Sequence, residues 1–137
     1  MNYLAKIILF SLIGSCLCAN GLAQEQSAPS DQEARAVVAT YLDALAQGDT
    51  FTIKQLLGSD YLQQRQSILD NPAYPNLLSA RYSVATSRIL ATQQINQNTM
   101  AVDALIELSK QETLQCRFIL AKSGSDQIKI IREEEHN

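Results

Sequence analysis

The chain has 137 residues, of which 46% are apolar and 18% are charged. Its 11 basic and 14 acidic residues give a net charge of 11 − 14 = −3 at pH 7. This length fits one domain. The acidic balance argues against a nucleic-acid-binding protein, which would carry a basic stripe, and the apolar content excludes a mostly disordered chain. We therefore expect one folded domain with no nucleic-acid partner.

The N-terminus has the pattern of a signal peptide, because one cation, Lys6, precedes an apolar run over residues 7–19. That run is too short for a transmembrane helix, which needs roughly 20 apolar residues. Cleavage before Gln24 would leave small residues at the −3 and −1 positions. We predict a signal peptide over residues 1–23, a polar linker over residues 24–30, and a periplasmic or secreted protein.

A second way of processing the N-terminus stays open. Residues 13–16 read Ile-Gly-Ser-Cys and resemble a bacterial lipobox, in which the cysteine is acylated. Lipidation at Cys16 would anchor the protein in the outer membrane, and only then do we expect it to bind a membrane. Cleavage before Gln24 instead leaves Cys116 as the sole cysteine, so that no disulfide can form within the chain.

The first helix is predicted by its cap and its period. Ser30 and Glu33 form a capping box, and Gly48 is placed to end the helix as its C′ residue. Apolar side chains recur between them at the spacing of one helical face. These are Ala34, Val37, Val38, Tyr41, Leu42 and Leu45.

Two shorter helices are expected next. Asp49 can cap a helix over residues 50–57, and a third helix follows Gly58. Residues 71–76 contain two prolines and two asparagines and are predicted to be a loop.

From residue 81 onward the apolar period changes to two. Four strands are predicted, over residues 82–90, 100–108, 113–120 and 128–131, with hairpin turns between them. Helices followed by a meander give an α+β domain, with N-terminal helices packed on a four-stranded antiparallel sheet. The domain is expected to span residues 31–133, with a tail at 134–137, and the acidic run at residues 133–137 is interpreted as a solvated end.

Residues 37–57, VVATYLDALAQGDTFTIKQLL, resemble the opening helices of the nuclear transport factor 2-like superfamily. That superfamily includes ketosteroid isomerases, polyketide cyclases and many small exported proteins. The resemblance implies a cone, in which a curved sheet surrounds the long first helix and leaves a pocket at the wide end. The pocket residues that it implies are Val38, Tyr41, Leu45, Met100, Cys116 and Phe118.

The resemblance also allows a test for catalytic residues. In ketosteroid isomerases a tyrosine on the first helix donates a hydrogen bond to the developing enolate, and Tyr41 holds that position. The position of the general base is occupied by Arg65, which cannot accept a proton, and that of the second oxyanion donor by Cys116. We therefore predict no complete catalytic set. Tyr41 is either a core residue or a donor that needs another base, such as Asp60 or Asp43.

Other constellations are weaker. Cys116 lies between apolar residues at alternate positions, which is typical of a buried, inert thiol. Asp103 and Glu107 share one face of a strand and could pair as carboxylates, but the alternation favours a solvated sheet face. The one histidine, His136, and the absence of a cysteine pair at ligand spacing argue against a metal site. No cofactor is predicted.

Three functions remain open. The first is a non-catalytic envelope protein that binds a protein partner or a small apolar ligand through its sheet or cone. The strand face with Ala101, Leu105 and Ile119 would then offer a surface for a homodimer. The second is a cone-pocket enzyme of isomerase or cyclase type that uses Tyr41. The third is an accessory domain of an envelope assembly, anchored by lipid at Cys16.

Overall fold

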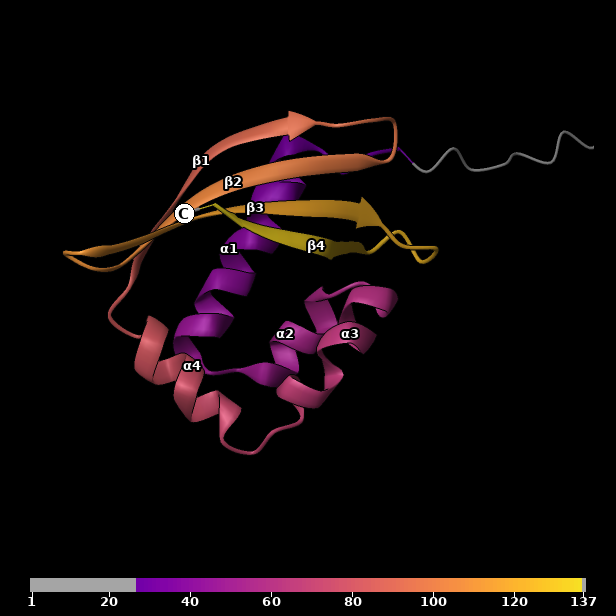
Figure 1. Ribbon diagram of the computed structural model, residues 1–137. Helices are drawn as coiled ribbons and strands as arrows, with labels where there is room; N and C mark the ends of the chain where they lie inside the picture. Colours follow the sequence, from indigo (N-terminus) through magenta and orange to yellow (C-terminus); the bar gives the residue numbers. More distant parts are fainter. Residues whose placement is uncertain (1–26, 137) are drawn as a thin grey trace, which may run out of the picture.

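The computed structural model describes residues 27–136 (Figure 1). The predicted signal peptide, the lipidation site at Cys16 and residues 24–26 of the linker lie outside this range. Four helices precede four strands. They are α1 (Asp31–Gln47), α2 (Thr50–Leu56), α3 (Ser59–Leu69), α4 (Tyr74–Tyr82), β1 (Thr86–Gln94), β2 (Thr99–Ser109), β3 (Glu112–Lys122) and β4 (Ile128–His136). Within residues 27–136, no helix combines the length and apolarity needed to span a bilayer.

The strands form one antiparallel sheet in the order β1-β2-β3-β4. The sheet curves over α1, and α2, α3 and α4 gather around the far end of that helix (Figure 1). The predicted α+β architecture, helices followed by an antiparallel meander, is therefore confirmed.

Local sequence determines α1 as predicted. The side chain of Ser30 accepts a hydrogen bond from the backbone N–H of Glu33, and the carboxylate of Glu33 accepts one from the N–H of Ser30. At the other end Gly48 has a φ of +65°, which is the left-handed conformation that suits glycine. Asp49 then caps α2, where its side chain accepts from the N–H of Thr52.

The loop predicted over residues 71–76 and the strand predicted over residues 82–90 are right only in part, because α4 occupies residues 74–82. Proline is tolerated in the first turn of a helix, where its missing N–H has no partner to lose, and Pro75 stands there. The strand β1 begins at Thr86 instead. The α4 helix packs on α1, with the backbone of Pro75 directly against Gly48.

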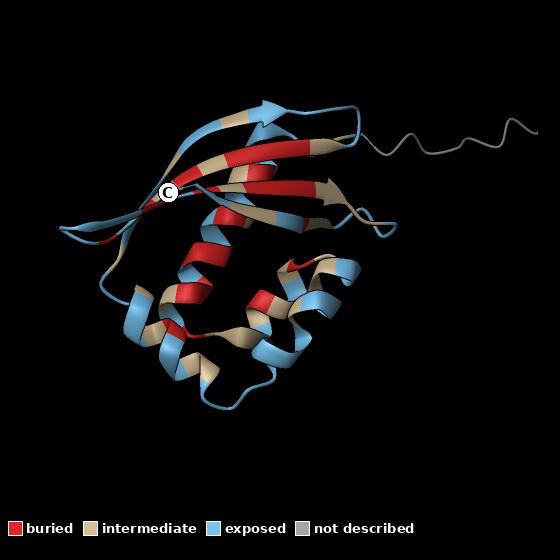
Figure 2. Cartoon of the chain, in the orientation of Figure 1, coloured by how far each residue is buried: buried red, intermediate tan, exposed pale blue. Residues whose placement is uncertain are grey.

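The core fills the space between α1 and the inner face of the sheet (Figure 2). Phe118 meets the ring of Tyr41 edge-on, with 5.5 Å between ring centres. All six residues expected to line a cone pocket belong to this buried core. They are Val38, Tyr41, Leu45, Met100, Cys116 and Phe118. Cys116 is buried, as the sequence predicted.

The last strand contains a β-bulge that decides where its acidic residues point. Leu120 pairs with Ile130, whereas Ile119 pairs with Arg132, so that one extra residue, Ile131, interrupts the register. A one-residue slip moves every later side chain to the opposite face. Glu133 therefore points inward opposite Phe118. The interpretation of the acidic run as a solvated end is wrong for Glu133, whose side chain is only 14% exposed. The strand β4 runs to His136, and Glu135 and His136 are exposed.

The outer face of the sheet exposes less apolar surface than predicted. Ala101 and Ile119 are already buried within the single chain. Asp103 accepts two hydrogen bonds from Arg117, of 2.7 and 2.9 Å, and does not pair with Glu107. A homodimer through this face stays a prediction.

Candidate functional site

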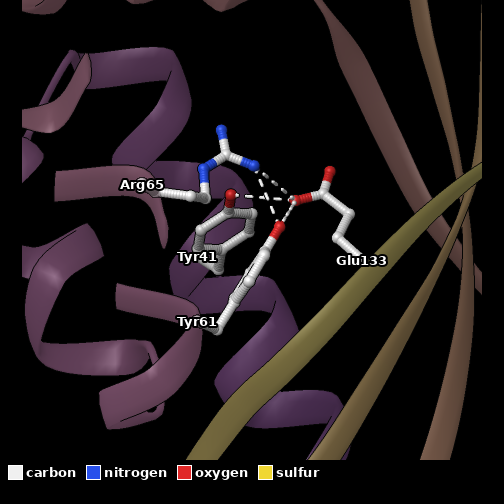
Figure 3. A network of polar contacts seen from close by, with 4 residues as sticks. All are labelled: Tyr41, Tyr61, Arg65 and Glu133. Atoms are coloured by element: carbon white, nitrogen blue, oxygen red, sulfur yellow. Dashed lines mark hydrogen bonds and ion pairs between the residues drawn. The ribbon is translucent and has the colours of Figure 1, made fainter. Parts of the chain in front are cut away.

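The carboxylate of Glu133 is the centre of a polar network inside the cone (Figure 3). The hydroxyl of Tyr41 donates to Oε2 of Glu133 at 3.1 Å, and that of Tyr61 donates to the same oxygen at 3.4 Å. Nη1 of Arg65 lies 3.8 Å from Oε2 and donates to the Tyr61 hydroxyl at 2.9 Å. Three side chains thus converge on one carboxylate oxygen.

Three elements bring these side chains together. Tyr41 comes from the buried face of α1 and Glu133 from the inner face of β4 beyond the bulge. Tyr61 and Arg65 are four residues apart on α3, so they share one face of that helix. The guanidinium of Arg65 also lies over the Tyr61 ring, 5.6 Å from its centre. The helix α3 therefore presents Tyr61 and Arg65, already bonded to each other, to the carboxylate of Glu133.

Burial dominates the electrostatics of this network. It raises the pKa of Glu133 above the ordinary value, although the positive charge of Arg65 and the hydrogen bond from Tyr41 act in the opposite direction. Burial and the negative charge of Glu133 hold the pKa of Tyr41 well above its usual range. Tyr41 is therefore a permanent donor near neutral pH, whereas Glu133 can accept a proton more readily than an exposed glutamate.

Only one of the two carboxylate oxygens of Glu133 accepts hydrogen bonds from the described residues. Every hydrogen bond to Glu133 from residues 27–136 goes to Oε2, and none of these residues donates to Oε1. In Figure 3 the second oxygen points away from the two tyrosines. Oε1 of Glu133 could therefore accept a proton while Oε2 keeps its hydrogen bonds from the two tyrosines.

Cys116 and Glu135 lie next to this network on the inner face of β3 and β4, where they face each other in the register. The ligand atoms of Cys116, Glu133 and Glu135 lie within 4.8 Å of one another. Burial raises the pKa of the Cys116 thiol to about 12, so it is protonated at neutral pH. This set is one ligand short of a four-coordinate structural zinc site.

The three positions taken from the superfamily resemblance come together in space. The hydroxyl of Tyr41 donates to Glu133, and Arg65 and Cys116 both lie near the same carboxylate. The alternative bases Asp43 and Asp60 are both exposed, and neither makes a hydrogen bond to Tyr41.

The sequence analysis missed Glu133, which is the acidic group of the site. A signal was present, because the strict alternation of β4 fails at two consecutive apolar residues, Ile130 and Ile131, where the bulge lies. If the alternation of inward and outward side chains is continued past the bulge, it places Glu133 on the outer face.

An open hollow in the described part of the chain lies outside the cone. We call it the α3–β4 groove. It has a volume of about 680 Å³ and lies between the start of α3, the end of β3 and the start of β4. Of the polar network only Tyr61 reaches it. The groove is lined by Lys54, Leu57, Gly58, Ser59, Asp60, Tyr61, Leu62, Ala121, Lys122, Ser123, Lys129 and Ile131. A smaller hollow of about 240 Å³ lies along β1 and β2.

No protein-family model matches the chain, and no curated protein matches its sequence. Solved structures do match its fold. One is a provisionally assigned ketosteroid isomerase from Shewanella frigidimarina, with 15% identity and a TM-score of 0.60, over 80% of this chain and 99% of that one. Another is a nuclear transport factor 2-like protein of unknown function from Shewanella baltica, with 11% identity and a TM-score of 0.56, over 77% of this chain and 93% of that one.

The structural match establishes the fold, and at such low sequence identity it leaves the activity open. The chain has the nuclear transport factor 2-like fold, as its opening helices indicated.

Proposed function

We propose that this protein is an exported, non-catalytic binding protein whose ligand is a small apolar molecule held on the surface of the cone. The observation that carries this proposal is the packing of Tyr41, which is 1% exposed and donates its hydroxyl to Glu133. An enzyme that used Tyr41 would need that hydroxyl free to meet a substrate.

The packed core and the open groove on the surface also support a surface-bound ligand. The residues at the centre of the cone, including Phe118 and Met100, are packed in the core. The α3–β4 groove, in contrast, is open, has the size of typical ligand sites and carries apolar side chains such as Leu62 and Ile131. We therefore place the ligand in the groove.

The binding proposal is tested with Nile red, a neutral apolar dye whose fluorescence rises in apolar surroundings. We expect saturable binding of one dye per chain, weakened several-fold by Ile131→Gln. Leu90→Gln is the matched control, because Leu90 lies at the bulge of the other edge strand and is 44% exposed, against 41% for Ile131. Absence of saturable binding, or equal effects of both variants, would contradict the proposal.

Export is proposed from the N-terminal pattern alone. Fractionation of the native cells, followed by N-terminal sequencing of the processed chain, tests it. A soluble periplasmic chain that starts at Gln24 agrees with the proposal. A membrane-bound chain acylated at Cys16 would favour the lipid-anchored accessory domain, and an unprocessed cytoplasmic chain would contradict export.

A second candidate, a cone enzyme, is favoured by the contact between Tyr41 and Glu133. Glu133 supplies the carboxylate that was lacking at the other family positions, and its pKa is raised by burial. The assay is isomerisation of a β,γ-unsaturated ketosteroid, in which Glu133 would remove the proton next to the carbonyl. Turnover that disappears in Glu133→Gln but persists in Glu134→Gln would establish the enzyme and overturn the non-catalytic proposal.

A further inference from the structure

We propose that the ligand of the α3–β4 groove is a single-chain anionic amphiphile, such as a fatty-acid-like carboxylate. This inference rests on the proposed binding function and specifies its ligand class. Its basis is the placement of lysines in an acidic protein. Residues 27–136 contain four lysines, and three of them, Lys54, Lys122 and Lys129, line this one groove.

The remaining lining residues fit the two halves of such a ligand. Leu57, which follows α2, and leucine, alanine and isoleucine side chains from α3, β3 and β4 provide an apolar wall. Ser59 and Ser123 provide hydroxyl donors. Lysine stems add apolar surface while their ammonium groups stay at the rim. Asp60 is the one carboxylate among the lining residues, so positive charge exceeds negative charge by two.

The start of α3 adds a second positive contribution. This helix has 11 residues, and its N-cap, Gly58, offers no side chain to bond the first backbone N–H groups. Both Gly58 and Ser59 line the groove. Free N–H groups at a helix N-terminus favour an anion, and here they lie on the same groove as the three lysines.

The three lysines differ in how far they are engaged. Lys54 pairs with Asp70, and the ammonium of Lys129 donates to the backbone carbonyl of Gln55. Lys122 forms no ion pair with any residue that the structure describes. Its charge is therefore available to a ligand, and its replacement breaks no ion pair within that range.

The test measures how decanoate, an anion, and decyltrimethylammonium, a cation with the same chain, displace Nile red below their micelle concentrations. We expect decanoate to displace the dye at clearly lower concentration. Lys122→Gln should weaken decanoate about threefold and Lys122→Glu about tenfold, because an exposed charge contributes modestly to affinity. Direct calorimetric titration of decanoate gives the same comparison without the dye.

Lys110→Gln and Lys110→Glu are the matched controls. Lys110 is the one described lysine outside the groove, in the turn between β2 and β3, and its replacement changes the net charge equally. Equal effects at Lys110 and Lys122, equal displacement by both amphiphiles, or no calorimetric binding of decanoate would overturn the anionic ligand. Dye binding that persists in these cases leaves the proposed function standing, whereas its absence before any competitor is added contradicts that function.

Discussion

The hydroxyl of Tyr41 on α1 donates a hydrogen bond of 3.1 Å to Glu133 on β4, across 92 residues of sequence. The first helix and the last strand of the domain thus meet at a buried polar contact. Tyr61 and Arg65 complete it from α3. Because buried polar groups cost free energy unless they are paired, this contact ties three elements to one arrangement.

Glu133 should make the stability of the fold depend on pH. Its pKa is raised above the ordinary value of 4.5 in the folded protein, so the folded chain holds this proton more tightly than the unfolded chain does. The stability that Glu133 contributes is present at low pH and is lost as pH rises through its folded pKa. Glu133→Gln removes this titration. We expect the wild type to lose more stability than the variant between about pH 4 and about pH 7.

Urea unfolding across this pH range measures the difference. Glu134→Gln is the control, because Glu134 lies on the outer face of the same strand, where it pairs with Arg132. Identical pH slopes for the wild type and Glu133→Gln would show that Glu133 does not titrate differently in the folded state.

Tyr41→Phe should shift the titration of Glu133 upward. The hydrogen bond from Tyr41 stabilises the carboxylate of Glu133 and lowers its pKa, whereas burial raises that pKa. Loss of the hydrogen bond should therefore raise the pKa further. The variant should also lose about 1 kcal/mol of stability, the usual contribution of one hydrogen bond. NMR titration of the Glu133 carboxyl carbon checks the shift. Tyr74→Phe, which removes a hydroxyl outside the network, is the control, and an unchanged or lower pKa in Tyr41→Phe would contradict this prediction.

Cys116 should be inert to alkylation in the folded protein. Burial raises the pKa of its thiol to about 12 from an ordinary 9.0, and the thiolate is the reactive form. At mildly alkaline pH we expect labelling by iodoacetamide to be on the order of a thousandfold slower than in urea. Peptide mass spectrometry assigns the label to Cys116. Rapid labelling under native conditions would show that the cone opens.

Gly48→Ala should be strongly destabilising. A Cβ at this position would lie 2.2 Å from the backbone oxygen of Pro75, and the φ of +65° is unfavourable for alanine. We expect a loss of about 2 kcal/mol or more in urea unfolding. Gly124→Ala is the control, because its Cβ would meet no atom within 4 Å. Equal stability of the two variants would contradict close packing of α4 on α1.

Local sequence was sufficient for most of the fold. The capping box of Ser30 and Glu33, the left-handed Gly48 and the cap at Asp49 are interactions within a few residues, so the sequence alone predicts them. The change of apolar period from helix to strand is also local, and it gave the order of the elements. The α4 helix was missed because a proline reads equally as a loop residue and as a first-turn residue of a helix.

The tertiary structure decided the site. Arg65 and Cys116 could be named from the sequence, but the carboxylate that lies near both could not. Glu133 faces inward only because Ile131 is the extra residue of a bulge, and a bulge depends on how β4 pairs with β3. Pairing between strands is a long-range property. The sequence therefore determined the helices and strands apart from α4, while the register of the last strand determined that a glutamate lies buried beside Tyr41.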